Sequence, residues 1–391
     1  MPNTVCNTFL LLMSVVCVLP PRTVLVQGVI LSLKDETNLS LTNNHLDDKL
    51  EPFPAPFLSQ ENLLRWTGSK CDRRIVGDVT GLRSKRLFVA FLFAFDELAL
   101  YIQLTELFPI VSRIFILEAE VSHQLQPKPL ILSRILERPY MHLFKSKIEH
   151  IVVTEAEFKS VKIPTREEAA NLPQPLRTST FRSGEYFSRL RLVEAAAAKM
   201  TKKDVLILSD ADEIVSRDTL LVLKHCRLHW PMASINLLWR QFKVNCYQKK
   251  PWKINVVTGH HIFRYLATDK SSEYWRKDNP VSSGRLLKKT SDAVSTISLG
   301  WHLSYMCFRD EEMLRKLSTI VDYNQLPNHT LFVKKWSPGS CLFQADGSFN
   351  REKYRPFVHS ESELRNDQRL SPLYIRKNIE WFRRNNCFTS D

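Results

Sequence analysis

The sequence predicts an α/β fold in which helices flank a mostly parallel β-sheet, followed by a second half of mixed strands and helices. From Lys85 to Leu228, short aliphatic runs typical of buried strands alternate with segments whose apolar residues recur at helical spacing. Strands that alternate with helices favour parallel pairing with helices on both faces. After Ala233 the pattern shifts to strands, and helices return near the carboxyl end.

Each element is expected from its own pattern. Apolar runs predict strands in the first half over 87–93, 114–117, 148–153 and 204–208. Helical periodicity, helped by four consecutive alanines in the second helix, predicts helices over 97–107, 181–200 and 219–228. The second half is expected to hold strands over 234–244, 256–266 and 294–299, and helices over 311–321 and 373–384.

Composition places the chain among ordinary globular proteins. It has 391 residues, of which 44% are hydrophobic and 25% charged. The formal charge of +14 suits an anionic partner. The basic residues are scattered and accompany no nucleic-acid motif, so we expect no nucleic-acid partner. A basic face around a nucleotide-diphosphate pocket, or near an anionic membrane, accounts for the charge equally well.

The amino-terminal segment, residues 1–33, is expected to be a signal peptide or an uncleaved membrane anchor. Its two apolar stretches are each shorter than a spanning helix, and Pro20-Pro21 separates them. Both interpretations send the chain into the secretory pathway; the alternative is a buried helix of a cytosolic protein. Residues 34–84, with Pro52, Pro54 and Pro56, predict an extended stem before a globular domain over 85–391.

Glycosylation sequons and cysteines agree with a lumenal location. The sequons begin at Asn38 and Asn328. Six cysteines follow the amino-terminal segment, enough for up to three disulfides in an oxidising compartment, and they are Cys71, Cys226, Cys246, Cys307, Cys341 and Cys387. Their spacing does not resemble a zinc site, and the sequence leaves their pairing open.

Three carboxylates follow the strand expected over 204–208. Asp210, Asp212 and Glu213 stand where this strand should leave the sheet, which is where open α/β sheets gather their ligands. Crowded carboxylates repel each other unless a cation lies among them, and hard divalent ions prefer oxygen ligands shared with phosphates. The pattern therefore predicts a metal site for a nucleotide diphosphate. The alternative is a solvated acidic loop that caps the next helix.

Several segments resemble glycosyltransferase family 17, and they occur in the family's order. These segments are Phe95–Leu98 with Glu106-Leu107, Phe115–Glu118 with His123 and Pro127–Leu130, Glu185 with Arg189, Leu208–Ile214, and Gly300–Ser304. Together they cover roughly residues 85 to 325. The chain departs from the family pattern at Asp96, Ala99 and Leu125, and these departures bear on the identity of the acceptor.

The resemblance implies a GT-A-like fold, a UDP-sugar donor and a divalent cation such as Mn²⁺. Asp210 and Asp212 would hold the ion, with His302 as a third ligand. The ion would neutralise the charge that develops on the leaving diphosphate. Asp210 has an alternative role in holding the ribose, and His302 has an alternative role as a packing residue beside Trp301.

Inversion at the sugar requires a carboxylate that takes the acceptor's proton. Glu213 is the candidate nearest to the metal site, and Glu97, Glu118, Glu185 and Asp292 compete with it. The alternative for Glu213 is to stabilise the amino end of the following helix by its charge.

Four further residues are expected to bind substrate. Arg189 and Glu185 lie one helical turn apart, so they either hold the diphosphate and a sugar hydroxyl or form a surface ion pair. Lys128 lies between two prolines and either contacts phosphate or is solvated. Trp301, like Trp239 and Trp252, either stacks on a sugar or packs in the core.

The family resemblance thus implies an inverting transferase that moves N-acetylglucosamine from UDP-GlcNAc to a mannose of N-glycans in β-1,4 linkage. The catalytic domain would act in the Golgi lumen, held to the membrane by the amino-terminal segment if it is uncleaved. Three alternatives stay open: a transferase of another sugar or acceptor, an inactive carbohydrate-binding member, and a metal-dependent phosphohydrolase.

Overall fold

The structure is a computed structural model, and its described residues all belong to one compact unit, Thr42–Asp391. They are residues 85–122, 126–160, 174–226, 232–241, 243–247, 251–268, 300–308, 310–317, 357–358, 360–367, 370–385 and 387–388. The predicted amino-terminal segment, the stem, the strand over 294–299 and Asp292 lie outside these ranges. Within them, no helix combines the length and the apolar character needed to cross a membrane.

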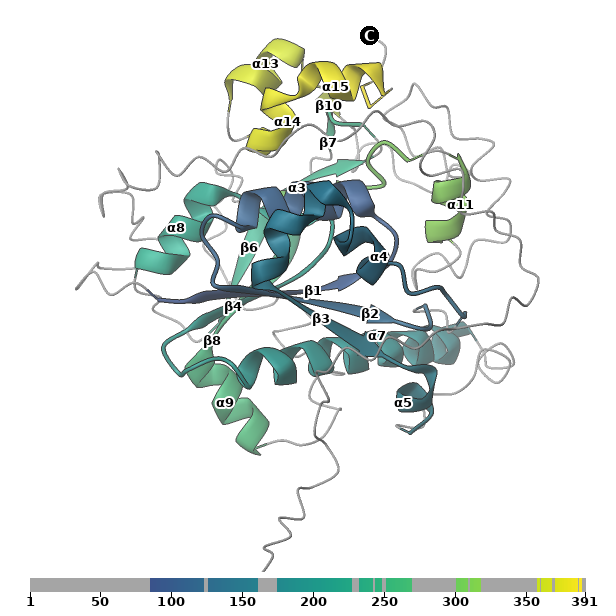
Figure 1. Cartoon of the computed structure of the whole chain (residues 1–391), viewed down its shortest axis with the longest axis vertical. Coiled ribbons are helices and arrows are strands. Elements are labelled where there is room, and N and C mark those ends of the chain that lie inside the picture. The colour runs from purple at the N-terminus through teal and green to yellow at the C-terminus, as the bar shows by residue number, and fades with distance from the viewer. Residues whose placement is uncertain are drawn as a thin grey trace, which may run out of the picture. The chain divides into compact units, whose positions relative to one another are not determined.

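Four parallel strands form the centre of the sheet, as the sequence predicts. They are β1 (Leu87–Phe93), β2 (Arg113–Ala119), β3 (Ile148–Val153) and β4 (Val205–Asp210). The strand order is β4-β1-β2-β3, and every neighbouring pair is parallel (Figure 1). All seven residues of β1 are buried, because helices cover both faces of the sheet at this strand.

Alternate side chains of β1 enter two separate cores. Val89 and Phe91 face the core that contains α3 (Glu97–Leu107), and Phe88 and Ala90 face the core under α7 (Gln174–Ala197). Figure 1 shows these two helices on opposite faces of the sheet. Continuous apolar strands are therefore required here, since a polar residue on either face would enter a core.

Shorter elements complete the connections of this first half. They are α4 (Leu132–Leu136), the 3-10 helix η3 (Pro139–Lys147), α5 (Glu155–Ser160) and α8 (Arg217–His225). The hydroxyl of Ser216 accepts a hydrogen bond from the backbone N–H of Thr219 and so caps α8. This serine, and not Glu213, is the residue that caps the helix after the acidic motif.

The second half adds antiparallel and mixed pairings, as expected. Strand β8 (Trp252–Thr258) lies antiparallel to β4, and β6 (Met232–Gln241) lies antiparallel to β8. Farther along β6, β9 (Gly300–Ser304) runs parallel to Leu238–Gln241 and also pairs antiparallel with β5 (Glu213–Val215). His302 thus lies within a strand, whereas the sequence placed it after one.

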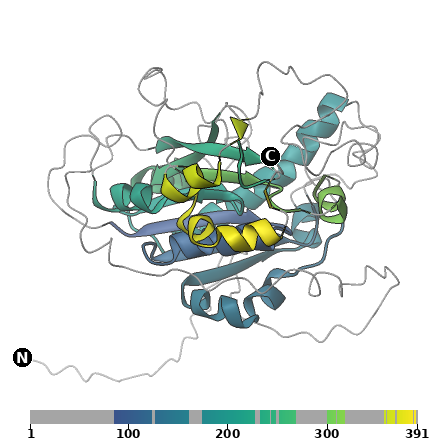
Figure 2. The same cartoon turned by 90° about the horizontal axis from the view of Figure 1, so that it is seen from above.

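Further elements lie in the second half of the chain, and one of their helices packs against α3. They comprise β7 (Cys246–Tyr247), α11 (Asp310–Leu317), β10 (Phe357–Val358), α13 (Glu361–Asn366), α14 (Leu373–Lys377) and α15 (Ile379–Arg384). Figures 1 and 2 show the yellow helices α14 and α15 on the same side of the sheet as α3, and the backbone N–H of Tyr374 in α14 donates to Glu106 of α3 at 3.3 Å. A disulfide joins Cys307 to Cys387.

Two predicted elements are wrong in detail. The strand expected over 256–266 ends at Thr258, and α9 (Gly259–Thr268) begins at once. The apolar residues of the expected strand continue from the end of β8 into the start of α9. At the boundary, a Cβ at Gly259 would lie 2.1 Å from the carbonyl oxygen of Thr201. The helix expected over 373–384 is two short helices that meet at Asn378.

The strand order places a topological switch between β1 and β4. After β1 the chain builds β2 and β3 on one side and then returns to form β4 on the other. Ligands of open α/β sheets bind outside the carboxyl ends of the strands at such a point. Asp96 follows β1 and Asp212 follows β4, so this edge of the sheet is the place to look for a site.

Candidate functional site

The acidic turn after β4 is held against β9 by backbone pairing. Glu213 lies opposite His302 in the β5–β9 ladder, and the backbone N–H of Leu303 donates to the carbonyl oxygen of Asp212 at 2.7 Å. A Cβ at Gly300 would lie 2.1 Å from the carbonyl oxygen of Ile214, so glycine is needed for this close approach. The two motifs of the sequence, 89 residues apart between Glu213 and His302, are therefore neighbours in space.

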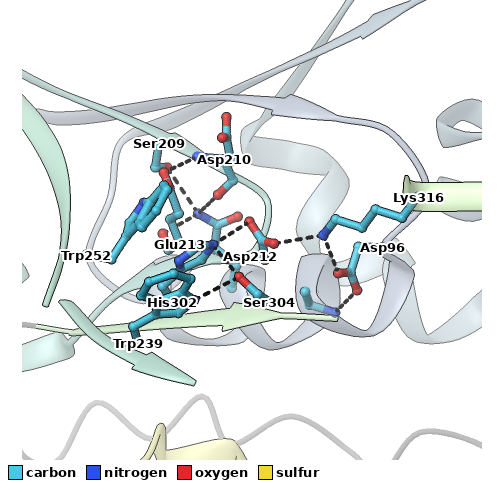
Figure 3. Close-up of polar contacts among 12 residues, drawn as sticks. Asp96, Ser209, Asp210, Asp212, Glu213, Trp239, Trp252, His302, Ser304 and Lys316 are labelled. Carbon is cyan, nitrogen blue, oxygen red and sulfur yellow. Dashed lines mark hydrogen bonds and ion pairs between the residues drawn. The ribbon is translucent and has the colours of Figure 1, made fainter. Parts of the chain in front are cut away.

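The carboxylate of Asp212 lies between the side chains of Lys316 and His302, which come from different elements. Its Oδ2 atom accepts a hydrogen bond from Nζ of Lys316 at 2.9 Å, and its Oδ1 atom lies 3.6 Å from Nε2 of His302 (Figure 3). The 3.6 Å separation is too long for a direct hydrogen bond. Burial acts to raise the pKa of Asp212, but Lys316 and His302 outweigh it and hold this pKa well below its ordinary value.

Lys316 of α11 also reaches the start of α3. Its Nζ lies 3.4 Å from Oδ2 of Asp96, whose Oδ1 accepts the backbone N–H of Ala99 at 3.2 Å (Figure 3). Burial raises the pKa of Asp96 to about 6, although Lys316 acts to lower it. Burial acts to lower the pKa of Lys316, but the charges of Asp212 and Asp96 raise it above its ordinary value, so the ammonium stays charged.

Asp210 faces a different cation. Nη2 of Arg189 donates to both carboxylate oxygens of Asp210, at 2.9 and 3.1 Å, and Nε of Arg189 donates to Glu185 at 2.9 Å. The side chain of Asp210 points away from that of Asp212 in Figure 3. The predicted pair of Glu185 and Arg189 does reach the acidic motif, but the two aspartates do not face a common point.

Glu213 has both carboxylate oxygens engaged by the protein. Oε2 accepts the backbone N–H of Asp210 at 2.6 Å, and Oε1 accepts the indole N–H of Trp252. Burial, followed by the negative charges of Asp210 and Asp212, raises its pKa well above the ordinary value. Each oxygen has a second lone pair, and a proton-accepting role would use one of these or replace one of the two hydrogen bonds.

Three rings stand beside the acidic turn. The ring centroids of Trp252 and His302 are 4.4 Å apart, and the ring of Trp239 stacks on His302 at 6.0 Å with an interplanar angle of 18°. The hydroxyl of Ser304 connects Trp239 and His302, because it accepts the indole N–H of Trp239 at 3.3 Å and lies 2.9 Å from Nε2 of His302. Two half-buried indoles next to the carboxylates are the kind of surface on which sugars stack.

Two residues predicted to bind substrate lie elsewhere. Trp301 is buried in the core on the opposite face of β9 from His302, so it cannot stack on a sugar unless the core opens. Lys128 lies against Phe95 and 3.5 Å from Glu118, with only 5% of its side chain exposed. We assign both residues to packing, which is the alternative that the sequence left open for Trp301. For Lys128 the alternative was a solvated side chain, and the structure instead buries it beside Glu118.

The sequence did not point to three residues that complete the site. Asp96 was noted only as a departure from the family, although its place after β1 was a usable signal. Gln103 of α3 is buried, and its Nε2 lies 3.1 to 3.3 Å from Ser209 Oγ and from the backbone carbonyl oxygens of Asp210 and Glu213. Lys316 gave no local signal, because α11 reaches the acidic turn through tertiary packing.

The donor set fits a divalent cation in part. Among the described residues there is no group of three or more His, Cys, Asp or Glu side chains arranged to hold a metal. Asp212 and His302 do form a pair whose 3.6 Å separation suits two ligands of one ion. Mg²⁺-like ions are often held by only one or two protein ligands, with water and substrate phosphates completing the shell.

The parallel strands, the switch point and the acidic turn are consistent with a GT-A-like glycosyltransferase fold. The family model for glycosyltransferase family 17 matches residues 71–332, and the chain belongs to that family. It is therefore a glycosyltransferase. A search of the curated proteins found no significant match.

Proposed function

We propose that the chain transfers N-acetylglucosamine from UDP-GlcNAc to a mannose of N-glycans in β-1,4 linkage, with inversion at the sugar. Its membership of family 17 supports transfer of a sugar. The finer assignment rests on the resemblance of Leu208–Ile214 and Gly300–Ser304 to the mannosyl-glycoprotein N-acetylglucosaminyltransferases of that family.

One observation carries the proposal: Asp212 and His302 face each other at the carboxyl edge of the sheet, 3.6 Å apart. We propose that they hold a divalent cation such as Mn²⁺. The bound ion would supply a Lewis acid that neutralises charge on the leaving diphosphate. The carboxylate of Asp212 is held ready for this role, because its pKa lies well below its ordinary value.

The chain's other residues would bind and orient the donor and the acceptor. Arg189 donates to both oxygens of the Asp210 carboxylate and so orients it at the end of β4, where it could also accept a hydrogen bond from a ribose hydroxyl. The indoles of Trp239 and Trp252 offer apolar faces for an acceptor sugar. Burial and the charges of Asp210 and Asp212 raise the pKa of Glu213 above its ordinary value, and this carboxyl stays our candidate for the base.

Disulfides support a location in the secretory pathway. Cys307 is bonded to Cys387, and Cys226 and Cys246 are also disulfide-bonded. Disulfides form and persist in oxidising compartments, which agrees with the lumenal domain and Golgi membrane attachment that we propose.

The test is to incubate the purified full-length chain with Mn²⁺, a panel of UDP-sugars and defined N-glycans, and to analyse the products by mass spectrometry. We expect one N-acetylglucosamine to be added to a mannose, with release of UDP. Transfer to another acceptor would correct the substrate. UDP release without any benefit from a glycan would instead identify a phosphohydrolase, and binding without turnover would identify a carbohydrate-binding protein.

A further inference from the structure

Lys316 occupies a prepared place beside the acidic turn. Its ammonium lies 2.9 Å from Asp212 and 3.4 Å from Asp96, and these two carboxylates come from different strand ends of the switch point. It also lies over the rings of Tyr305 and Phe308, at 4.9 and 5.4 Å from their centroids. The side chain is 18% exposed, so its charge acts in a largely desolvated setting.

The loop that carries the two aromatic rings is itself constrained. Tyr305 and Cys307 both adopt left-handed backbone conformations, with φ of 57° and 60°. The disulfide from Cys307 to Cys387 fixes this loop to the carboxyl-terminal segment. The ammonium is thus held by a preformed cage, and not by the chance contact of a flexible surface side chain.

We propose that Lys316 is a built-in cation of the donor site, a role that rests on the function proposed above. Its ammonium donates to Oδ2 of Asp212, while Oδ1 of Asp212 faces His302. Lys316 therefore contributes one positive charge next to the place where the divalent ion would bind. This fixed charge weakens the binding of the ion alone and strengthens the binding of the nucleotide diphosphate.

The two effects have opposite signs because the ligands have opposite charges. A permanent ammonium near Asp212 repels an incoming divalent cation and attracts the phosphate oxygens that follow it. Removal of the ammonium should therefore strengthen the binding of the divalent cation alone and weaken the binding of the nucleotide diphosphate. A residue that served only to hold the fold would loosen both, since each ligand needs the same ordered turn.

The experiment compares the full-length chain with its Lys316→Met variant. Mn²⁺ affinity is measured without nucleotide, by electron paramagnetic resonance of the free ion, and UDP affinity by calorimetry at saturating Mn²⁺. We expect Lys316→Met to bind Mn²⁺ more tightly and UDP more weakly, each on the order of tenfold. Lys316→Arg keeps the charge and should shift both affinities less.

Asp96 provides the charge-compensated control. Asp96→Asn keeps an N-cap for α3 but removes a negative charge, so it should weaken Mn²⁺ binding and strengthen UDP binding. The double variant of Lys316→Met with Asp96→Asn restores the wild-type charge of the pair. We expect its Mn²⁺ affinity to return towards the wild-type value, and this variant also avoids two unpaired carboxylates if the single variant folds poorly.

Lys147→Met is the matched control for loss of a caged lysine. Lys147 donates to the carbonyl oxygens of Phe108 and Val111 at 2.6 and 2.9 Å, under the ring of Phe108, at the other end of β2 from the site. The Lys147→Met variant should have a lower melting temperature and unchanged affinities for Mn²⁺ and UDP.

The proposal fails if Lys316→Met weakens Mn²⁺ and UDP binding together, or changes neither. If Lys316→Met gives either of these results and the wild-type chain transfers sugar, the proposed function stands and only the role of Lys316 is lost. If wild-type chain binds neither Mn²⁺ nor UDP, the proposed function falls and this inference falls with it.

Discussion

Two buried carboxylates at the carboxyl edge of the sheet, one on β2 and the other after β4, have the same types of partner but different kinds of bond. Glu118 is the last residue but one of β2, and Asp212 follows β4. Each carboxylate has a lysine and a histidine within 4 Å. Glu118 has Lys128 at 3.5 Å and His150 at 3.4 Å. Asp212 has Lys316 at 2.9 Å and His302 at 3.6 Å. A list of nearby residues therefore would not tell the two sites apart.

The difference lies in the backbone. Glu118 accepts hydrogen bonds from the backbone N–H groups of Ile131 and Leu132, at 2.7 and 3.1 Å, and so holds the chain at the start of α4. Among the described residues, the partners of the Asp212 carboxylate are side chains, which can move aside for a ligand. A carboxylate satisfied by backbone is part of the fold, and one satisfied by side chains is available for binding.

The largest effect is expected at Asp212. Asp212→Ala removes the carboxylate proposed to hold the ion, and we expect transfer to fall by at least about a hundredfold. The melting temperature should stay nearly unchanged, because Lys316 retains Asp96 as a partner. Full activity in this variant would remove the metal role from Asp212; product formation and a thermal melt measure the two quantities.

The reverse outcome is expected at Glu118. Glu118→Ala leaves Lys128 and two backbone N–H groups without their carboxylate, and removing one member of a buried pair costs about 3–5 kcal/mol. Denaturant unfolding should show this loss, while UDP affinity of the folded protein stays the same. A normal stability with lost UDP binding would reverse our assignment of the two carboxylates.

Stability against pH should separate Glu118 from Glu213. Burial acts to raise the pKa of Glu118, but His150, Lys128 and the backbone bonds lower it, so its contribution is present above pH 4.5 and is lost as pH falls through the folded pKa. The pKa of Glu213 is raised, so the folded state binds more protons and stability falls as pH rises above about 4.5.

Unfolding free energies from about pH 2 to about pH 8 test this contrast, because the contribution of Glu118 changes below the ordinary glutamate pKa of about 4.5 and that of Glu213 changes above it. Relative to wild type, Glu213→Gln should gain stability with rising pH and Glu118→Gln should lose it. If Glu213 is also the base, Glu213→Gln loses transfer while it keeps UDP affinity. Parallel pH curves for the two variants would contradict the assigned directions.

The smallest effect is expected at Lys128. Lys128→Met keeps the apolar contact with Phe95 but removes the ion pair with Glu118, which still accepts two backbone hydrogen bonds. We expect a loss of about 1 kcal/mol of stability and no change in UDP affinity. A loss of UDP affinity as large as that expected for Lys316→Met would show that Lys128 binds phosphate after all.

Much of the fold could be predicted from the sequence because its central strands are buried on both faces. A run such as Leu87–Phe93 must be apolar throughout, and its predicted bounds agree with β1. The boundary between β8 and α9 was missed, since apolar residues continue across it and only Gly259 marks the change. The local hydrophobic pattern predicts long, uniform elements but does not mark the boundary where one element directly follows another.

The site could be predicted where its residues belong to sequence motifs. Asp212, Glu213 and His302 do come together, because β5 pairs with β9. The roles assigned to them stay predictions. Lys316 could not be found, because its position depends on how α11 packs against the loops after β1 and β9. A lysine on a short amphipathic helix looks the same in sequence whether it faces solvent or a buried carboxylate.

The central claim is that Asp212 and His302 hold an ion that in turn holds the diphosphate of the donor. Calorimetric titration of UDP into the full-length chain, once with Mn²⁺ and once with EDTA, tests it most directly. We expect binding with Mn²⁺, and loss of that binding both in EDTA and in Asp212→Ala. Equal UDP affinity with Mn²⁺, with EDTA and in Asp212→Ala would contradict the claim.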